Sequence, residues 1–398
     1  MRYTTCVMLP VEMRDVVSTT FRVAMLGAGL IADHYATAIQ SRRSRDTVTA
    51  VYSRGAARAE DFARRHSVAH SFTDLAEAVN HPDVDIVVIA LPNSEHLAAV
   101  EIAAAAGKPV LCTKPLGRTV AEARRMLELV EEAGVFAGYL EDLVFTPKTL
   151  AAVATTRAGL LGEIVSVRSR EAHSGPHSSW FLDAESAGGG VLLDLGSHCV
   201  EIIRGFVGKD IRPLEVMCWT DIRTAGGVVE DNAFALVKFE NGAIGQVDVS
   251  WTARGGMDLR DEVNGTEGTL RLDHFQHTGY ELFTSSTVGG TEKADGGGGW
   301  QFPVADDVTA TGNLDMFREM FDAVEEGRAP SETFLDGYIV NAVLDACYRS
   351  AAERAWVAVE LERSVKLFDT AYDDHAVRIA KSIGGAAAIR EQINEMSR

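Results

Sequence analysis

A glycine-containing turn between a strand and a helix constrains the fold of this chain more than any other feature. Residues 27–32 read Gly-Ala-Gly-Leu-Ile-Ala and fit the pattern G-x-G-x-x-A, after the apolar segment 21–26 and at the start of a helical pattern over 30–41. The first glycine permits the tight turn, the second lets the backbone approach a pyrophosphate, and the small alanine lets the helix pack on the strand. N–H groups at the helix N-terminus can bind phosphates. This segment therefore predicts a dinucleotide site.

The region around this turn alternates between short apolar runs and helical stretches. The predicted strands cover 21–26, 47–52, 86–91 and 109–113, and the predicted helices cover 30–41, 56–66, 94–106 and 119–134. We expect Asn93 or Ser94 to cap the helix over 94–106 and Gly107 to end it. Strands and helices that alternate at this spacing predict a parallel, doubly wound sheet.

After about residue 142 the pattern favours antiparallel strands with fewer helices. The predicted strands cover 214–222, 232–239, 243–251 and 269–272, the predicted helices 196–206, 314–326 and 336–360, and a glycine-rich loop 288–300. Asn241-Gly242 predicts a two-residue hairpin turn. We therefore expect an α/β N-terminal Rossmann domain and an α+β C-terminal domain with a large, mostly antiparallel open sheet. The predicted boundaries are an extension over 1–20, the Rossmann domain over 21–142, a second α/β domain over 143–362, and a helical tail over 363–398.

The charge balance and the short apolar runs exclude several classes of protein. The chain has 398 residues, with 57 Asp plus Glu against 38 Lys plus Arg and a formal net charge of -19. Because it lacks a basic stripe, we expect no nucleic-acid partner. The longest apolar run, 86–91, is too short to cross a bilayer, and early charges argue against a signal peptide, so we expect no membrane association. Five scattered cysteines without a C-x-x-C pair favour reduced thiols and a cytoplasmic location.

The residues after the second predicted strand bear on which dinucleotide binds. Ser53 and Arg54 stand where NAD enzymes usually present Asp or Glu to the adenosine ribose, and Arg58 follows one helical turn later. A guanidinium can bind a 2′-phosphate through two hydrogen bonds. We therefore expect NADP in preference to NAD. If Arg54 instead stacks on the adenine or faces solvent, the protein should tolerate both cofactors.

Three further motifs, together with the glycine turn, resemble those of one family. They read Pro-Asn-x-x-His over 92–96, Thr-Lys-Pro over 113–115, and Gly-Gly-Gly-x-x-x-Asp-x-Gly-x-His over 188–198. From residue 21 to about 355 the chain resembles the glucose-fructose oxidoreductase / inositol dehydrogenase / MocA (Gfo/Idh/MocA) oxidoreductase family, whose usual Glu-Lys-Pro is Thr113-Lys114-Pro115 here. The resemblance implies a nicotinamide cofactor in the first domain and a substrate pocket on the second. It also implies that the open sheet face forms the interface of a homodimer or homotetramer.

Lys114, Asp194 and His198 are the predicted catalytic residues. Oxidation of a secondary alcohol needs a base for the hydroxyl proton, and His198 has a suitable side chain. Asp194 lies four residues earlier on the same helix face, where it can bind a substrate hydroxyl or orient the imidazole. Lys114 can stabilise charge at the reacting oxygen. Without the other motifs, Asp194 and His198 would also fit a helix cap and a buried structural histidine.

The predicted site residues divide into a cofactor set and a substrate set. The cofactor set is Gly27, Gly29, Leu30, Ile31, Ser53, Arg54, Arg58, Leu91, Pro92, Asn93, His96 and Lys114, and the substrate set is Glu141, His173, His177, Trp180 and Asp194. Polar and aromatic side chains over 171–180 suit a sugar, and a polar surface loop is the alternative. The residues that could also bind a divalent metal are Glu141, His173, His177, Asp194 and His198. Hydride transfer to nicotinamide requires no metal, and we expect none.

These features predict an NAD(P)-dependent oxidoreductase that transfers hydride between nicotinamide and a secondary hydroxyl of a sugar, glycoside or cyclitol. The alternative is a glycosidase of the same family that retains its nicotinamide and works by transient oxidation and elimination. The surplus of titratable groups near the cleft favours that alternative. A third hypothesis is a redox sensor that binds nucleotide without catalysis, and the presence of Lys114, Asp194 and His198 argues against it.

Overall fold

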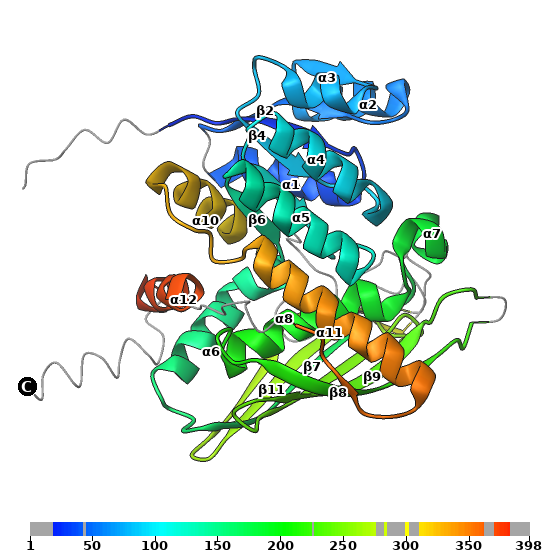
Figure 1. Ribbon diagram of the computed structural model, residues 1–398, viewed down its shortest axis with the longest axis vertical. Helices are drawn as coiled ribbons and strands as arrows, with labels where there is room; N and C mark the ends of the chain where they lie inside the picture. The colour runs from blue at the N-terminus through cyan, green and yellow to red at the C-terminus, as the bar shows by residue number, and fades with distance from the viewer. Residues whose placement is uncertain are drawn as a thin grey trace, which may run out of the picture.

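The computed structural model describes residues 19–42, 45–224, 227–275, 282–284, 299–301, 310–361 and 370–382. These residues form two large sheets, one in each half of the chain, with helix α8 (Val191–Val207) between them (Figure 1). Most of the predicted N-terminal extension, residues 288–298 of the predicted loop and residues 363–369 and 383–398 of the predicted tail lie outside the described residues. In the part of the chain that the structure describes, no helix has the length and apolar character needed to span a membrane.

The N-terminal half forms a six-stranded parallel sheet in the order β3-β2-β1-β4-β5-β6. Its strands are β1 (Arg22–Leu26), β2 (Thr47–Tyr52), β3 (His70–Phe72), β4 (Ile86–Ile89), β5 (Val110–Thr113) and β6 (Ala137–Leu140). Its helices are α1 (Leu30–Arg42), α2 (Ala56–His66), α3 (Leu75–Asn80), α4 (His96–Ala105) and α5 (Val120–Ala133). This is the strand order of a Rossmann domain, and it places the ends of β1 and β4 side by side at the point where the order reverses. The predicted fold class of this half is confirmed.

The start of α4 differs from the prediction. Residues 93–95 form a separate short 3-10 helix, η1 (Asn93–Glu95), and α4 begins at His96. The prediction that Asn93 or Ser94 caps this helix is wrong, because Glu95 stands at the N-cap without a side-chain cap, and the Asn93 amide donates to the carbonyl of Ala187, 2.8 Å away. That hydrogen bond joins the loop after β4 to the second half of the chain, a contact that local sequence does not reveal. Gly107 follows the end of the helix, as predicted, with φ of +67°.

The C-terminal half forms a seven-stranded sheet in the order β12-β11-β7-β10-β9-β8-β15. Its strands are β7 (Ile164–Ala172), β8 (Pro213–Asp221), β9 (Asn232–Phe239), β10 (Ile244–Ser250), β11 (Asp258–Gly265), β12 (Thr269–Asp273) and β15 (Val357–Ala358). Among the described strands of this sheet, only the β7–β10 pair is parallel. The predicted mostly antiparallel sheet is therefore confirmed.

Strands β7 and β11 were missed because charged side chains interrupt their apolar pattern. Arg170 on β7 pairs with Asp248 on β10, with 2.6 Å between Nη1 and Oδ1, and with Asp258 on β11, with 2.8 Å between Nε and Oδ2. Such cross-strand pairs stabilise a sheet. The two carboxylates lie 78 and 88 residues away along the chain. The charged side chains that interrupt the strand pattern in the sequence therefore find their partners only when the strands pair in the sheet.

The hairpin between β9 and β10 has a longer loop than predicted. The N–H of Phe239 donates to the carbonyl of Ala243 over 3.0 Å, so that residues 240–242 form a three-residue loop. Gly242 has φ of +88°, in the region that favours glycine. Three-residue hairpin loops typically place a residue in this conformation to form a bulge. The Asn241-Gly242 signal therefore identified the hairpin correctly, but the predicted two-residue length was wrong.

Several helices of the second half differ in extent from the predictions. The remaining elements are η2 (Leu143–Phe145), α6 (Pro147–Arg157), η3 (Ser179–Leu182), α7 (Ala184–Ala187), β13 (Leu282–Thr284), β14 (Gly299–Gln301), α10 (Asn313–Glu326), α11 (Phe334–Glu353) and α12 (Thr370–Ser382). The helix predicted over 336–360 is α11, which ends at Glu353 because Arg354 adopts φ of +56° and the chain turns into β15. The helix predicted from residue 196 is α8, which begins at Val191.

The N-terminus of α8 is capped by a carboxylate from a distant loop. The Glu230 side chain accepts hydrogen bonds from the backbone N–H groups of Gly190 (2.9 Å) and Leu192 (3.1 Å) and from the hydroxyl of Tyr348 (2.8 Å). A Cβ atom on Gly190 would lie 2.0 Å from the carbonyl oxygen of Glu230, so only glycine permits this approach. The cap satisfies N–H groups that the helix leaves unpaired and places negative charge at its positive end. Glu230 therefore fixes the start of the helix that carries Asp194.

Replacement of Glu230 by alanine should lower the free energy of unfolding by about 1–2 kcal/mol, the size of a lost helix cap. Tyr348→Phe removes only one donor to the same carboxylate and should cost less. Urea unfolding followed by circular dichroism measures both changes. An unchanged midpoint in Glu230→Ala would contradict the capping role.

Candidate dinucleotide and substrate site

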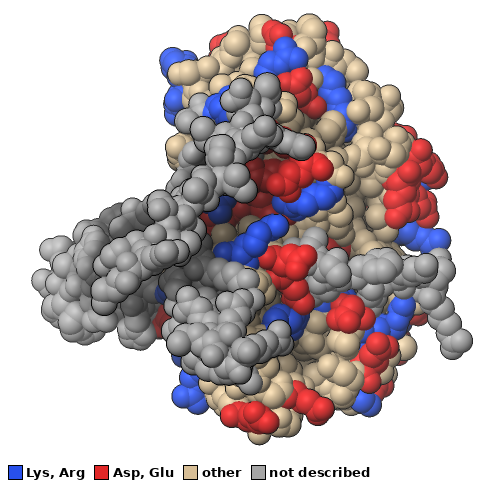
Figure 2. Space-filling model, turned by 90° about the vertical axis from the view of Figure 1, so that its left-hand side faces the viewer, with Lys and Arg blue, Asp and Glu red and all other residues tan. Residues whose placement is uncertain are grey.

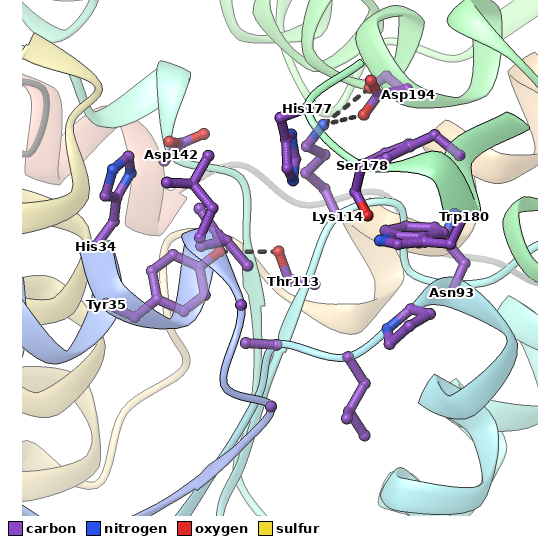
Figure 3. A pocket seen from close by; sticks show the side chains of 18 of the residues that line it. His34, Tyr35, Asn93, Thr113, Lys114, Asp142, His177, Ser178, Trp180 and Asp194 are labelled. Carbon is purple, nitrogen blue, oxygen red and sulfur yellow. Dashed lines mark hydrogen bonds and ion pairs between the residues drawn. The ribbon is translucent and has the colours of Figure 1, made fainter. Parts of the chain in front are cut away.

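A cavity of about 460 Å³ lies where the carboxyl ends of the first-sheet strands meet α8 and the segment after β7. Figure 3 shows side chains from both halves of the chain pointing into it. The predicted site residues that line it are Gly27, Gly29, Leu30, Ile31, Ser53, Arg54, Arg58, Leu91, Pro92, Asn93, Lys114, His177, Trp180, Asp194 and His198. His96, Glu141 and His173 are not among the lining residues, and all three are buried.

Two glycines shape the cavity next to β1. Gly27 has φ of +122°, and a Cβ atom there would lie 2.1 Å from the carbonyl oxygen of Ala90, so only glycine lets the turn approach β4 this closely. At Gly29 a Cβ atom would meet nothing within 4 Å, so the backbone borders open space. This space lies at the N-terminus of α1, a 13-residue helix whose first N–H groups can bind phosphates. The backbone at Gly27 and Gly29 and the N-terminus of α1 thus form a phosphate cradle, which fits a dinucleotide pyrophosphate.

The residues after β2 carry the positive charge expected at the adenosine end of the site. Ser53, Arg54 and Arg58 all line the cavity. The Arg54 side chain is 76% exposed, and its guanidinium lies 3.5 Å from the carboxylate of Glu95, which also lines the cavity. Glu95 would therefore compete with a phosphate for Arg54.

His96 lies behind the cavity and connects two of the loops that line it. Its Nε2 is 2.9 Å from the carbonyl oxygen of Leu91, and its Nδ1 is 3.1 Å from that of Leu116. The ring is fully buried, and burial lowers its pKa. His96 was predicted to bind the cofactor, but the structure places it as a support for the loops that carry Leu91 and Lys114.

Lys114 and Asp194 form an ion pair inside the cavity (Figure 3). The ammonium lies 2.7 Å from Oδ1 of Asp194 and 3.1 Å from its carbonyl oxygen. Burial lowers the pKa of Lys114, but the carboxylates of Asp194 and Glu171 outweigh this effect, so that the pKa lies above its ordinary value. Lys114 therefore stays charged at neutral pH and can stabilise an oxyanion beside it.

His198 lies one helical turn after Asp194 and is oriented by a buried carboxylate. Its Nδ1 contacts the carboxylate of Glu141, which follows β6 and has no exposed surface. Burial raises the pKa of Glu141 to about 8, although the charge of Lys114 opposes the shift. The Nδ1 contact orients the ring of His198, a residue that lines the cavity. Glu141 was predicted to bind substrate, but the structure places it behind His198 instead.

Glu171, near the end of β7, lines the cavity and was not among the predicted site residues. Its side chain is buried, with 2% of the residue exposed, and its Oε2 has no hydrogen-bond partner among the described residues. Burial raises the pKa of its carboxyl group well above the ordinary value, although Lys114 opposes the shift. The polar segment 171–180 hinted at this position, but without β7 the direction of the side chain was not predictable.

Tyr35 and Thr113 are two further lining residues that sequence reasoning missed. Their hydroxyl oxygens lie 2.8 Å apart, and Figure 3 shows the two side chains meeting across the cavity floor. Thr113 stands where the resembling family usually has glutamate. Its hydroxyl is thus used in a neutral hydrogen bond rather than in a charged contact with Lys114.

An aromatic wall formed by the segment after β7 borders the cavity. The rings of Trp180 and Phe181 stack with centroids 3.9 Å apart, and His177 meets Phe181 edge-on at 5.0 Å. Trp180 and His177 line the cavity, whereas His173, predicted beside them, is buried outside its lining. An aromatic surface next to charged and polar groups suits the C–H face of a sugar ring.

One group of potential metal ligands lies at the cavity. Single ligand atoms of Glu141, Asp142 and His198 all lie within 4.8 Å of one another. Of the five residues considered as metal ligands from the sequence, only Glu141 and His198 belong to this described group, and they contact each other. The geometry therefore favours an acid–base pair, and the expectation that no metal is needed stays a prediction.

The phosphate cradle and the acid–base groups open into one cavity, as an oxidoreductase that uses a nicotinamide dinucleotide requires. Residues 21–139 match the oxidoreductase family with an NAD-binding Rossmann fold, and residues 149–271 match the GFO/IDH/MocA C-terminal domain. The chain therefore belongs to the Gfo/Idh/MocA oxidoreductase family, which confirms the resemblance drawn from the motifs.

Individual relatives agree with this assignment. Levoglucosan dehydrogenase of Pseudarthrobacter phenanthrenivorans is 28% identical over 337 residues, which cover 76% of this chain and 86% of that protein. 1,5-Anhydro-D-fructose reductase of Ensifer adhaerens is 30% identical over 334 residues, which cover 83% of this chain and 96% of that protein. The solved structure of GenD2 from gentamicin A biosynthesis, in complex with NAD, superposes with a TM-score of 0.79 at 34% identity and covers 89% of this chain and 100% of that one. The predicted enzyme class, an NAD(P)-dependent dehydrogenase, is confirmed.

Proposed function

We propose that this enzyme transfers hydride between nicotinamide and a secondary hydroxyl of a sugar, glycoside or cyclitol. The observation that supports this most is the shared cavity, in which the open cradle at Gly29 and the side chains of Lys114, Asp194 and His198 line one space. The names of the relatives, levoglucosan dehydrogenase and 1,5-anhydro-D-fructose reductase, support a carbohydrate as substrate. The aromatic wall at Trp180 fits the same class of ligand.

A bound dinucleotide would supply the hydride acceptor for oxidation, and the chain supplies the proton transfer. In this proposal Nε2 of His198 accepts the proton of the substrate hydroxyl, while Glu141 holds the ring in place through Nδ1. Lys114 stabilises the negative charge that develops on the reacting oxygen. Asp194 positions Lys114 and accepts a hydrogen bond from a substrate hydroxyl. In the reductive direction His198 returns the proton.

The family's glycosidase reaction is the alternative, and Glu171 gives it specific support. A second buried carboxyl group near Lys114 could serve as the extra acid that an elimination step needs. The products distinguish the two functions. A dehydrogenase forms reduced nicotinamide in proportion to the substrate consumed, whereas a glycosidase releases the aglycone without net reduction.

Replacement of His198 by alanine should lower the rate of nicotinamide reduction by about 10²–10⁴-fold, the contribution of a positioned acid–base group. The measurement is absorbance of the reduced cofactor over a panel of sugars and inositols with NAD and NADP. His70→Ala, on β3 and outside the lining of the cavity, is the matched control and should leave the rate unchanged. Undiminished turnover in His198→Ala would remove this residue from its proposed role.

The pH profile tests the role of Glu141 in the same assay. Oxidation should speed up as the pH rises through about 8, because the His198–Glu141 pair must lose its shared proton before it can accept that of the substrate. Glu141→Gln removes the titrating carboxyl group, so the rising limb at about pH 8 should be lost. A limb at the same pH in both proteins would argue against this role.

We propose that NADP binds more tightly than NAD. Ser53, Arg54 and Arg58 line the cavity next to β2 and can bind an adenosine 2′-phosphate. Two observations favour NAD instead. Glu95 pairs with Arg54, and the GenD2 structure holds NAD.

Arg54→Ala should weaken NADP binding by about tenfold, the worth of one charge-assisted hydrogen bond, and should change NAD binding little. Glu95→Gln should strengthen NADP binding because it removes the competing carboxylate. Calorimetric dissociation constants for both cofactors check these expectations. Equal losses for NAD and NADP in Arg54→Ala would contradict the assignment.

We propose that the open face of the second sheet forms the interface of a homodimer or homotetramer. Helices α8 and α11 pack on one face of this sheet (Figure 1). On the other face Trp219 and Phe234 are each 45% exposed, and they stand opposite each other on β8 and β9 with ring centroids 5.8 Å apart. Leu236 extends this apolar patch along β9. Exposed apolar patches of this kind mark protein interfaces.

A Trp219→Asp, Phe234→Asp double variant should be monomeric, because two buried carboxylates without partners would destabilise the interface. Light scattering coupled to size-exclusion chromatography compares it with the unmodified protein at one concentration. Circular dichroism checks that the variant is folded. A monomeric unmodified protein would refute the proposed interface.

We also propose a cytoplasmic location and no nucleic-acid partner. Cys112, Cys199, Cys218 and Cys347 are free and buried, as is typical of proteins in a reducing compartment. On the face in Figure 2, acidic and basic side chains lie interleaved, and the described atoms of that face show no continuous basic stripe. Both observations support the expectations from composition.

A further inference from the structure

The cavity around Lys114 has more negative than positive groups. Asp142, Glu171 and Asp194 line it, whereas Lys114 is the only Lys or Arg of the described lining apart from the two arginines next to β2. The Lys114 ammonium is already hydrogen-bonded to Asp194, at 2.7 Å. Buried carboxylates in this number need compensation, because an uncompensated charge in the protein interior is costly. A proton on one carboxyl group, or a cation supplied from outside, can provide this compensation.

Glu171 is the group best placed to receive that cation. It is 2% exposed, it lines the cavity, and its Oε2 has no hydrogen-bond partner in the described part of the chain. The groups that act on it electrostatically are Lys114, Asp194, Glu141 and Asp142, three of them acidic. A neutral polyol can hydrogen-bond either form of the Glu171 carboxyl group, whereas a cation stabilises its carboxylate form.

We propose that the substrate carries an amino group and that its ammonium pairs with Glu171; this rests on the proposed dehydrogenase function. The substrate class is then an amino sugar or an aminocyclitol. Its ammonium offers three N–H donors, one of which bonds Oε2 of Glu171. The ring stacks on the aromatic wall at Trp180, and the hydroxyl that reacts faces His198.

The proposal predicts that substrate binding releases a proton, which binding of a neutral substrate would not do. Burial raises the pKa of Glu171 well above its ordinary value, which favours the protonated carboxyl group before the substrate binds. An ammonium beside it favours the carboxylate, and the proton leaves to solvent on binding. Binding of the amine is therefore coupled to proton release, whereas binding of the hydroxyl analogue is not.

The test compares matched compounds that differ at one carbon. Glucose and myo-inositol are each assayed beside their mono-amino-deoxy analogues and the N-acetyl derivatives of those amines. At least one amine should surpass both its hydroxyl and its N-acetyl partner in kcat/KM by about tenfold or more, the gain expected from one buried charge-assisted hydrogen bond. Calorimetry of the enzyme–cofactor complex in buffers of different ionisation enthalpy should detect proton release with that amine only.

Two glutamate variants locate the effect. Glu171→Gln keeps the size of the side chain and matches its protonated form, so the fold should be retained, and the preference for the amine should fall to within about threefold. Glu163→Gln makes the same change at an exposed position just before β7 and should leave the preference intact. A preference that survives in Glu171→Gln would overturn the proposal.

Failure of this proposal is distinguishable from failure of the proposed function. If no amine binds or reacts better than its hydroxyl analogue in any set, the amine assignment is wrong, while cofactor binding and oxidation of the neutral sugars still support the dehydrogenase. If calorimetry detects no binding of NAD or NADP, both proposals fall.

Discussion

The burial of one helix along its whole length determines where the candidate active site lies. Every residue of α8 is buried, including Asp194 and His198. Charged or titratable groups in a protein interior need partners, because desolvation without compensation is costly. Asp194 pairs with Lys114 and His198 with Glu141, and both partners come from the N-terminal half. The two pairs that compensate the buried Asp194 and His198 therefore also hold these acid–base groups at the carboxyl edge of the Rossmann sheet.

The other end of α8 is held by a second buried cluster of charges. Glu201 and Arg204 of α8 join Lys209, Glu332 and Asp336, with 2.6 Å between Arg204 and Glu201 and 2.9 Å between Lys209 and Glu201. These are three carboxyl groups against two cations, and burial raises the pKa of Glu332 well above its ordinary value. Burial thus favours the protonated form of Glu332, which would lower the negative charge of the cluster. Because Asp336 belongs to α11, the cluster anchors α8 against that helix.

The N-terminal fold was more predictable than the rest because its signals are local. A glycine turn and continuous apolar runs identify buried parallel strands without reference to distant residues. Strand β7 carries Arg170, whose carboxylate partners lie far along the chain, so the apolar pattern of a strand is interrupted there. Glu171 lies on the same strand, so its place in the cavity lining was not predicted either. Glu141 was expected to touch the substrate because it ends the last Rossmann strand, where the family presents cleft residues, and only the packing of α8 shows that it contacts His198.

The sequence by itself determined the family, the Rossmann fold and the identity of Lys114, Asp194 and His198 as candidate catalytic residues, because turns and helix faces depend on residues a few positions apart. Only the tertiary structure decided how those residues are partnered and charged. It pairs His198 with Glu141, raises the pKa of Glu141 to about 8, and leaves the Oε2 atom of Glu171 without a hydrogen-bond partner among the described residues. The physical reason is that a pKa depends on burial and on charges nearby in space, and these come from segments far apart in the sequence.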